Sequence, residues 1–469
     1  MLERTTLSTP CLPRIALTTF ALAVLGPHWT FAQVDLASHL PETSMSGLSE
    51  VLDSAMTGAD SIQLRDIVEK EYEGRRIVAA APKKLQLGGR ATYRKEQDIE
   101  RDDAELGDRL SYSLSLSKAL YHWGALKANR EIGELNLEIQ ELSTFETYRI
   151  LALDVRRQYL QIVVSKRDVE LKQKTLDVRN NRLDLERRRL ETGNASAVEV
   201  YNLELQSNAA DLDLLRSENT LQDQVDTLAR LVSIDTGSII EKLPSEVPVP
   251  VTLDSSQIDS LTVLFEQGVT SNVSIDQSRK SIDLFQKDLH IARQRNKPKL
   301  GVSVGITQFE LAETGRNRAE EIFFGGVTIT WNIFDSGSTK GSIVSAAARI
   351  EQMKHQFESA KSNYLFDLQR AQNLLGLNRR ILERDEVALS RARELVEEVR
   401  SQISAGIATE SSLDNSIISL ASQEVRTNRS RSDYHNALAN MTSLLGLDPF
   451  AQEFIERRTQ ERSLPIKSK

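Results

Sequence analysis

The segment Ser117-Lys118-Ala119-Leu120-Tyr121-His122-Trp123-Gly124 has a counterpart 213 positions later, in Thr330-Trp331-Asn332-Ile333-Phe334-Asp335-Ser336-Gly337. Three further pairs of short segments share this offset: 87–88 with 300–301, 191–193 with 404–406, and 231–235 with 444–448. Four matches at one constant offset indicate that the chain is a duplication of one large structural unit.

Both units have the same order of elements. A helical segment (46–81 and 256–296) precedes two strands, which lead into a very long helix, a short turn and a returning helix. Between the units, Pro244, Pro248 and Pro250 prevent a continuous helix. We therefore expect a first repeat at 46–242, a linker at 243–255, a second repeat at 256–450 and a polar C-terminal tail at 451–469.

The expected strands alternate between apolar and polar residues. Leu110-Ser111-Tyr112-Ser113-Leu114-Ser115-Leu116-Ser117 does so strictly, and 85–94, 302–307 and 327–331 follow the same period of two. Such alternation places the two kinds of side chain on opposite faces of a sheet. Two interpretations are open: a half-buried sheet packed on a helix in a soluble protein, or part of a membrane barrel with a wet lumen.

The polar segments 95–109 and 308–320 join the two strands of each pair and are expected to form exposed hairpin tips. Four strands cannot close a barrel, because the smallest single-chain barrels of outer membranes use about eight strands and lipid does not tolerate unpaired strand edges. The membrane interpretation therefore requires three chains that together supply twelve strands.

The helix expected from Gly124 to Leu190 has no proline and only one internal glycine, Gly133. At ~1.5 Å per residue it would be about 100 Å long. Two heptad series run along it, displaced by two residues and therefore on nearly opposite sides. The first seam is Val155, Ile162, Val169, Leu176, Leu183 and Leu190, and the second is Val164, Leu171, Val178 and Leu185.

Two opposed seams indicate helical neighbours on both sides, as in a curved wall of helices around a water-filled space. The second repeat keeps the first seam, in Leu368, Leu375, Leu382, Leu389, Val396 and Ile403. Of the second seam it keeps only Leu377, because Arg384, Arg391 and Glu398 stand at the other positions. The wall is therefore predicted mainly from the first repeat.

Residues 1–32 have the features of a secretory signal peptide. Arg4 and Arg14 are basic, 15–25 is an apolar run too short to span a membrane, and 30–32 supplies small residues before a cleavage point. The alternative is an amphipathic or misassigned N-terminal extension. Cys11 is the single cysteine, so the mature chain is expected to contain no disulfide.

Charge and motifs argue against several classes of function. A formal net charge of -8 makes nucleic acid an unfavourable partner. The six histidines are scattered without metal-ligand spacing, and no phosphate-binding glycine loop or nucleophile motif occurs. We therefore expect no enzyme activity, no catalytic residue, no cofactor and no metal site.

The long helices are expected to reverse at 191–196 and 404–409. Gly193 and Gly406 can adopt the left-handed conformation that ends a helix. Ser196 and Thr409 are candidates for capping the returning helices, with Glu199 at capping-box spacing from Ser196.

With these turns, the strand-to-helix corners at Gly124 and Gly337, and the closing segment 444–448, the chain resembles the TolC family of outer-membrane efflux proteins. The resemblance covers nearly the whole mature chain. It implies a mainly α fold with a small β part. Four strands per chain would form a trimeric outer-membrane β-barrel, continued by a long periplasmic α-helical barrel of coiled-coil hairpins.

The resemblance also implies function and partners. It implies a homotrimeric, passive export channel of a tripartite efflux or type I secretion system. The channel would lie in the cell outer membrane, with the helical part in the periplasm. The implied partners are a periplasmic adaptor (membrane fusion) protein, an inner-membrane transporter of the RND, ABC or MFS type, and outer-membrane lipid.

In that family the turns between the helices are thought to engage the adaptor. By this resemblance the docking residues are Gly193, Asn194, Ala195, Ser196, Gly406, Ile407, Ala408 and Thr409. Acids just beyond the turns often form the periplasmic aperture in the family, and the matching acids are Glu199, Glu410 and Asp414. Ser412 and Asn415 stand where the best-known member has aspartates. The alternative role of each acid is ordinary capping or surface charge.

The chief rival interpretation is a periplasmic coiled-coil adaptor, which would share the long helices and the signal peptide. Adaptors place one hairpin between lipoyl-like and barrel domains, whereas this sequence predicts two hairpins and Ser-lined strands. A third interpretation, a secreted filament subunit, gives no reason for the alternating strands.

Overall fold

The duplicated sequence produces helices of matching length. The computed structural model describes residues 35–96, 107–313, 316–453 and 456, so the predicted signal peptide, residues 97–106 and most of the tail lie outside the described residues. Three helices of the first repeat have counterparts whose first residues lie 213 positions later. The pairs are α2 (Asp60–Ala80) and α8 (Val273–Arg293), α3 (Ala125–Glu191) and α9 (Ser338–Ser404), and α4 (Ala197–Val232) and α10 (Glu410–Leu444).

Unusual backbone conformations repeat with the same offset. In the described part of the chain, the residues with positive φ form four pairs: Trp123 and Ser336, Gly124 and Gly337, Gly193 and Gly406, and Ser233 and Gly446. The first two pairs turn the chain from strand into long helix, and the other two end helices. Because side chains rarely adopt this left-handed conformation, its recurrence confirms the duplication.

The helical segment before the strands is broken in both repeats, whereas the sequence predicts one helix in each. In the first repeat the break is at Ala59, whose backbone is extended between α1 (Ser46–Gly58) and α2. In the second repeat Asn272 is extended, and its side chain accepts a hydrogen bond of 3.1 Å from the Ile275 N–H at the start of α8. The short elements of this region are η1 (Ala37–His39), η2 (Pro41–Thr43), η3 (Ala81–Lys83), α6 (Ser255–Ser260), η4 (Leu261–Leu264) and α7 (Phe265–Ser271).

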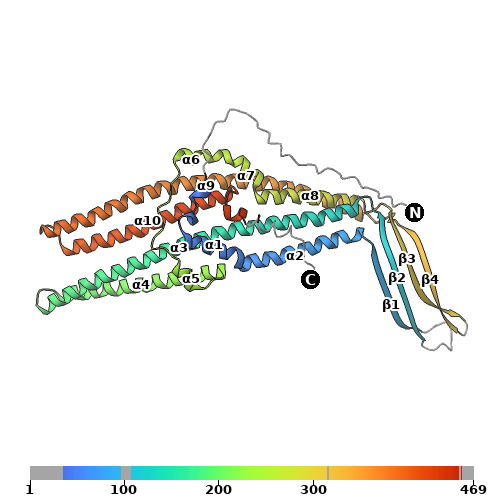
Figure 1. The fold of residues 1–469 in the computed structure, drawn as a ribbon, viewed down its shortest axis with the longest axis horizontal. Coiled ribbons are helices and arrows are strands. Elements are labelled where there is room, and N and C mark those ends of the chain that lie inside the picture. The colour runs from blue at the N-terminus through green and yellow to red at the C-terminus, as the bar shows by residue number, and fades with distance from the viewer. Residues whose placement is uncertain (1–34, 97–106, 314–315, 454–455, 457–469) are drawn as a thin grey trace, which may run out of the picture. The chain divides into compact units, whose positions relative to one another are not determined.

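The long helices lie side by side in an order that differs from the chain order. α3 packs against α2 and α4 of its own repeat and against α8 and α10 of the other repeat, while α9 packs against α8 and α10 (Figure 1). The hairpins α3–α4 and α9–α10 reverse at one end of the helices, and the sheet lies at the other end. The neighbours that the two seams predict on both sides of α3 are confirmed.

Burial of the seams follows these contacts. In α3, Val155, Ile162 and Leu183 of the first seam and Val164 of the second seam are buried, whereas Leu190 and Leu185, nearest the tip, are exposed. In α9 the first seam is buried at Leu368, Leu375, Leu382, Leu389 and Val396. The second-seam positions of α9, namely Leu377, Arg384, Arg391 and Glu398, are exposed. The missing second seam therefore corresponds to a face of α9 that is open in the described chain.

Four antiparallel strands form one sheet in chain order, with β1 and β4 at its edges. The strands are β1 (Gln86–Glu96), β2 (Gly107–Tyr121), β3 (Lys299–Glu313) and β4 (Arg316–Thr330). The prediction that 308–320 forms a hairpin tip is wrong, because most of this segment belongs to β3 and β4. Polar residues can continue a β-strand, because neighbouring strands are joined by hydrogen bonds between backbone groups.

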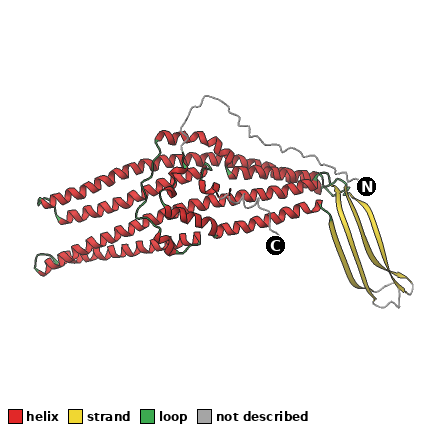
Figure 2. Ribbon diagram, viewed as in Figure 1, coloured by secondary structure: helices red, strands yellow, loops and turns green. Residues whose placement is uncertain are grey.

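The strand register aligns the alternation across the sheet. One row across the four strands contains Gly89, Leu114, Ile306 and Phe323, and a row on the opposite face contains Gln86, Ser117, Ser303 and Gly326. Ile322 and Phe324 interrupt the polar face. In the described part of the chain no helix covers either face of the sheet (Figure 2), and Phe323 remains 78% exposed. A sheet packed on a helix is therefore not what forms.

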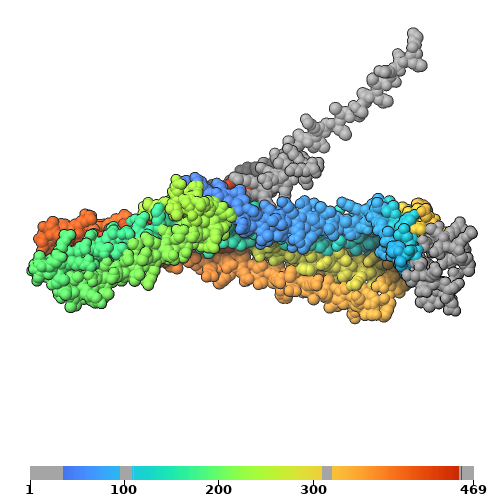
Figure 3. Space-filling model, turned by 90° about the horizontal axis from the view of Figure 1, so that it is seen from below, coloured from blue at the N-terminus to red at the C-terminus, as the bar shows by residue number. Residues whose placement is uncertain are grey.

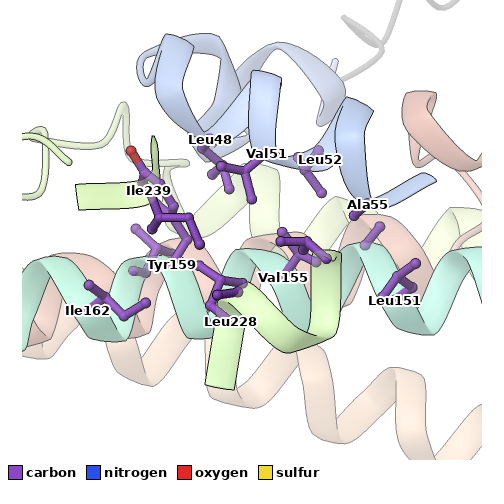
Figure 4. Close-up of a cluster of buried hydrophobic side chains, with 14 of the residues drawn as sticks. Leu48, Val51, Leu52, Ala55, Leu151, Val155, Tyr159, Ile162, Leu228 and Ile239 are labelled. Atoms are coloured by element: carbon purple, nitrogen blue, oxygen red, sulfur yellow. The ribbon is translucent and has the colours of Figure 1, made fainter. Parts of the chain in front are cut away.

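The main hydrophobic cluster lies midway along the helices, where α1, α3 and α4 meet. Leu48 and Leu52 from α1 face Val155 and Ile162 of α3 and Leu228 of α4 (Figure 4). Ile239 of the short helix α5 (Thr236–Glu241) closes the cluster. These residues are almost fully buried, so this cluster is the main apolar core that fastens the N-terminal segment to the first hairpin.

The linker between the repeats is packed rather than loose. Val247 is fully buried, and its N–H donates to Asn428 Oδ1 at 2.7 Å. The Leu253 N–H donates to the Tyr434 hydroxyl at 2.8 Å. Both acceptors belong to α10, so the linker is fastened along that helix.

A buried ionic cluster joins the N-terminal segment, α3 and the residues after α10. Arg156 donates to Glu42 at 2.6 Å and to Asp448 at 2.5 Å, and all three side chains are buried. Burial works to lower the pKa of Arg156, but Asp448 and Glu42 together raise it. The arginine therefore stays charged and holds both ends of the described chain to the middle of α3.

Candidate functional site

The tip of the first hairpin is a compact turn centred on a glycine. Gly193 has φ +78°, its N–H donates to the Leu190 carbonyl at 2.9 Å, and the Asn194 N–H donates to the Arg189 carbonyl at 2.7 Å. These two bonds form a Schellman motif, which satisfies the last carbonyls of α3. The Ser196 hydroxyl accepts from the Val198 N–H at 3.2 Å and caps α4.

The tip of the second hairpin has the same geometry. Gly406 has φ +74°, its N–H donates to the Ile403 carbonyl at 2.9 Å, and the Ile407 N–H donates to the Gln402 carbonyl at 2.8 Å. The Thr409 hydroxyl accepts from the Ser412 N–H at 3.3 Å and caps α10. The expected helix ends and caps are confirmed at both tips.

The expected docking residues are accessible at these tips. Ala195 and Ala408 are half-buried and the other six are exposed. Ile407 is 78% exposed although it is apolar. Nothing on the hairpin itself covers this side chain, so it is available to a partner.

The three expected aperture acids fall into two groups. Glu199 lies exposed in the first turn of α4, whereas Glu410 and Asp414 lie in the first two turns of α10. Burial raises the pKa of Asp414, the neighbouring charge of Glu410 raises it further, and Arg182 and Arg179 of α3 oppose the shift. The structure therefore places Asp414 beside Glu410 and near Arg182 and Arg179 of α3, and it leaves Glu199 on the other hairpin.

One contact between the hairpins was not predicted. Arg167 of α3 donates to Glu424 of α10 at 2.6 Å and to Glu170 at 2.5 Å. Arg167 and Glu424 are 257 positions apart, and nothing in the sequence pairs them until α3 and α10 are known to be neighbours. This ion pair fastens the second hairpin to the first, further from the tip than Asp414.

Aromatic side chains gather where the sheet meets the helices. The Trp123 Nε1–H donates to the Pro298 carbonyl at 2.7 Å, and the Trp331 Nε1–H donates to the Asn296 carbonyl at 2.8 Å. Ile333 and Phe334, just after β4, are 74% and 82% exposed. An apolar sheet face bordered by tryptophans and exposed apolar residues is typical of a surface at a membrane interface.

Within the described ranges, no helix has both the length and the apolar character needed to cross a membrane. Within the same ranges, no group of three or more His, Cys, Asp or Glu side chains could hold a metal ion.

Comparison with known proteins gives the same fold. The family model described as outer membrane efflux protein matches residues 78–233 and 265–447, which is more than half of the chain and includes both repeats. Because the match includes two hairpins, the periplasmic adaptor interpretation is not favoured. A comparison with curated protein sequences finds no significant match.

Several solved structures are similar to this chain. The outer membrane protein VceC from Vibrio cholerae is 18% identical, with a TM-score of 0.66 over 87% of this chain and 98% of that chain. The CmeC outer membrane channel of Campylobacter jejuni is 12% identical, with a TM-score of 0.71 over 91% of both chains. The open state of the MtrE outer membrane channel of Neisseria gonorrhoeae is 15% identical, with a TM-score of 0.64 over 86% of this chain and 89% of that chain.

The family match and the fold agree with the helical hairpins and the bare sheet described above. The chain therefore belongs to the outer membrane efflux protein family and is an export channel protein of the outer membrane.

Proposed function

We propose that three copies of this chain assemble into a passive conduit, with twelve strands in the outer membrane and a helical barrel in the periplasm. The observation that carries this proposal is the four-stranded sheet, whose two edges are open and whose apolar face is bare. Unpaired strand edges are not tolerated in lipid, so a membrane sheet of this size must be completed by other chains.

The edges of the helical layer support a ring of copies. Exposed apolar side chains at helical spacing form one face of α4: Val198, Tyr201, Leu205, Leu212 and Leu215. α2 continues this edge with Leu64, Ile67 and Val78, and Figure 3 shows α4 and α2 one after the other along the same side. We call these residues the leading stripe.

The opposite edge carries its own apolar side chains. Exposed residues of α9 lie on one helical face: Phe366, Leu374, Leu377, Ile381 and Leu395. We call them the trailing stripe. Because the two edges differ, the leading stripe of one copy would meet the trailing stripe of the next, and such a head-to-tail contact closes into a ring when the rotation fits.

The orientation follows from the two faces of the sheet. The apolar face, with Leu114 and Phe323, would contact lipid, and the face with Ser117 and Ser303 would line water. The helices then extend into the periplasm, and their tips point toward the inner membrane. We propose that the tip residues, Ile407 among them, engage a periplasmic adaptor, and that an inner-membrane transporter of the RND, ABC or MFS type supplies the energy for efflux or type I secretion.

The aperture would open when the second hairpin moves away from α3. Asp414 faces Arg182 and Arg179, and Arg167 pairs with Glu424, so these charges hold α10 against α3. Opening then requires these contacts to separate. We infer that Glu410 and Asp414 act with Glu424 as an electrostatic latch, while Glu199 lies outside it.

The experiment that tests the proposed function is purification from membranes followed by reconstitution. The protein should require detergent, sediment as a trimer, and form channels in planar lipid bilayers. A monomer that is recovered from the periplasm without detergent would contradict the proposal and favour an adaptor.

The latch has a separate test. Glu410→Ala with Asp414→Ala should increase single-channel conductance, and adding Glu424→Ala should increase it further. The control is Asp177→Ala with Asp184→Ala, which removes the same charge from exposed positions of α3 that lie outside the latch and both stripes. If both double variants have the conductance of the unmodified channel, the latch assignment is wrong although the channel remains.

A further inference from the structure

A cavity of ≈ 700 Å³ lies between α8 and α9, close to the start of β3. Its charged and polar lining includes Asp288 of α8, Gln294 and Arg295 just after α8, Lys299 from β3, and Ser342 and Arg349 from α9. None of these residues belongs to the tips or to the latch. The cavity therefore has no role in the proposed function so far.

The cavity is electropositive. Arg295, Lys299 and Arg349 line it, and among the described residues no ion pair joins any of them to a carboxylate. The Arg295 guanidinium donates to the Ser342 hydroxyl at 3.0 Å, which holds it at the cavity. Three cations in one cavity attract an anion, and arginines suit the oxygens of a phosphate group.

Carboxylates near the cavity do not neutralise these cations. Asp288 is the one acid in the lining; burial raises its pKa, and Arg349 opposes that shift. Asp335 lies near Arg295 and stays ionised, because the Thr339 hydroxyl and N–H donate to its carboxylate at 2.5 Å and 2.8 Å and lower its pKa. Even with both acids ionised, two negative charges stand against the three cations. The net charge at the cavity therefore remains positive.

A second, independent observation is a buried acceptor without a donor. Gln294 is 9% exposed, and among the described residues its Oε1 has no hydrogen-bond partner. Buried polar atoms are nearly always hydrogen-bonded, so a donor from a ligand would complete this one. A ligand for the cavity should thus combine negative oxygens with a hydrogen-bond donor.

One lining residue, Lys299, belongs to the polar face of the sheet. Lys299 precedes Leu300, so it lies on the same face of β3 as Gly301 and Ser303. That face lines the lumen in the proposed function, on which this inference rests. Three copies would then place a ring of such cavities where the helical barrel meets the strands.

We propose that this cavity binds a phosphate group, as free phosphate or as part of an anionic solute in the lumen. The negative oxygens of the phosphate contact Arg295, Lys299 and Arg349. The side-chain oxygen Oε1 of Gln294 accepts from a protonated phosphate oxygen. A phosphate monoester keeps such a proton near and below its second pKa of about 6, whereas sulfate carries no proton near pH 6. Phosphate should therefore bind better than sulfate.

The test uses the purified full chain in detergent and inorganic phosphate at pH 6, by titration calorimetry. Arg295→Gln with Arg349→Gln should weaken phosphate binding by about tenfold or more, since charge-assisted hydrogen bonds are lost. The matched control, Arg293→Gln with Lys340→Gln, removes two charges from α8 and α9 outside the lining and should bind like the unmodified protein. Gln294→Leu should remove the preference for phosphate over sulfate.

The possible outcomes separate this inference from the proposed function. Equal phosphate binding by both double variants, or no binding by the unmodified chain, overturns the phosphate site even if the protein forms trimeric channels. If the Arg295 and Arg349 variant alone loses binding, the site stands even if no channel forms in bilayers. In bilayers, phosphate should reduce the current of the unmodified channel and not that of this variant.

Discussion

The two repeats have nearly the same backbone but different surroundings. α3 and α9 each contain 67 residues and begin and end 213 positions apart. α3 has helices on both sides, whereas α9 leaves its second-seam face open. Two helices of the same length therefore occupy different places: α3 lies in the middle of the chain's helical layer, and α9 lies at its edge.

This difference shows where a duplicated element is free to change. At the level of the main core, Arg156 of α3 is fully buried between Glu42 and Asp448, while its counterpart, Gln369 of α9, is exposed. Arg156 has partners from both ends of the described chain, whereas Gln369 is exposed. The residue that a site requires is therefore set by the side chains packed around it more than by its position in the repeat.

The largest expected effect comes from Arg156. Arg156→Leu leaves Glu42 and Asp448 buried without a cation, which should lower the free energy of unfolding by about 3–5 kcal/mol. Gln369→Leu should change it by less than about 0.5 kcal/mol. Urea unfolding of the detergent-solubilised protein, followed by circular dichroism, measures both. An equal loss of unfolding free energy in the two variants would show that burial of the ion cluster does not distinguish position 156 from position 369.

A smaller effect is expected from the buried His435, whose counterpart in the first repeat is the exposed Gln222. Burial lowers the pKa of His435 to about 4 from 6.5, and the nearby Pro248 carbonyl only partly opposes the shift. Below pH 6.5 His435 is protonated in the unfolded chain but stays neutral in the folded chain. The free energy of unfolding therefore falls as the pH falls toward 4. Between pH 7 and pH 5 the loss should be about 2 kcal/mol.

Thermal unfolding at these two pH values checks the contribution of His435. His435→Leu should remove this part of the pH dependence, and His355→Leu, at an exposed position, should not. An unchanged slope in His435→Leu would mean that other groups cause the acid sensitivity.

Two glycines sharpen the comparison of the long helices. A Cβ at Gly133 of α3 would lie 2.7 Å from the Ala79 Cβ and 3.3 Å from the Arg76 Cα, whereas a Cβ at Gly376 of α9 would meet nothing within 4 Å. Gly133→Ala should therefore lose about 1–2 kcal/mol, after the gain in helix propensity is counted. Gly376→Ala should gain about 0.5–1 kcal/mol. Shifts of the same sign in the urea midpoint would contradict this difference.

The smallest effect is expected at the surface of the hairpins. Arg187 pairs with Glu204 across α3 and α4 at 2.6 Å, while its counterpart Arg400 pairs with Glu397 on its own helix at 2.8 Å. Both pairs are largely exposed, so a double-mutant cycle on either should give less than about 1 kcal/mol. A coupling several times larger at Arg187 would show that the tip is more rigid than its exposure indicates.

The sequence predicts the repeated framework well because that framework is local. Heptads along α3 and α9, glycines at the turns and alternation in the strands each specify an element through its own residues. The breaks at Ala59 and Asn272 contain no proline, and so the pattern does not reveal them. The full length of β3 and β4 was missed because polar residues extend a ladder without the apolar alternation.

The candidate site divides in the same way. The turn geometry and the caps at Ser196 and Thr409 follow from neighbouring residues and could be predicted. The pairing of Arg167 with Glu424, and the arginines opposite Asp414, depend on which helices become neighbours. The unpaired side-chain oxygen Oε1 of Gln294 also could not be predicted from the sequence, because its environment comes from α8 and α9 together.

The open edges of the sheet have a consequence for how the protein reaches its place in the cell. A lone chain leaves the outward edges of β1 and β4 unpaired, so it has no stable form within lipid. Insertion and association must then be one event, whose rate rises steeply with the concentration of free chains. Low expression should therefore leave chains waiting in the periplasm, exposed to proteases, instead of producing a proportionally smaller number of channels.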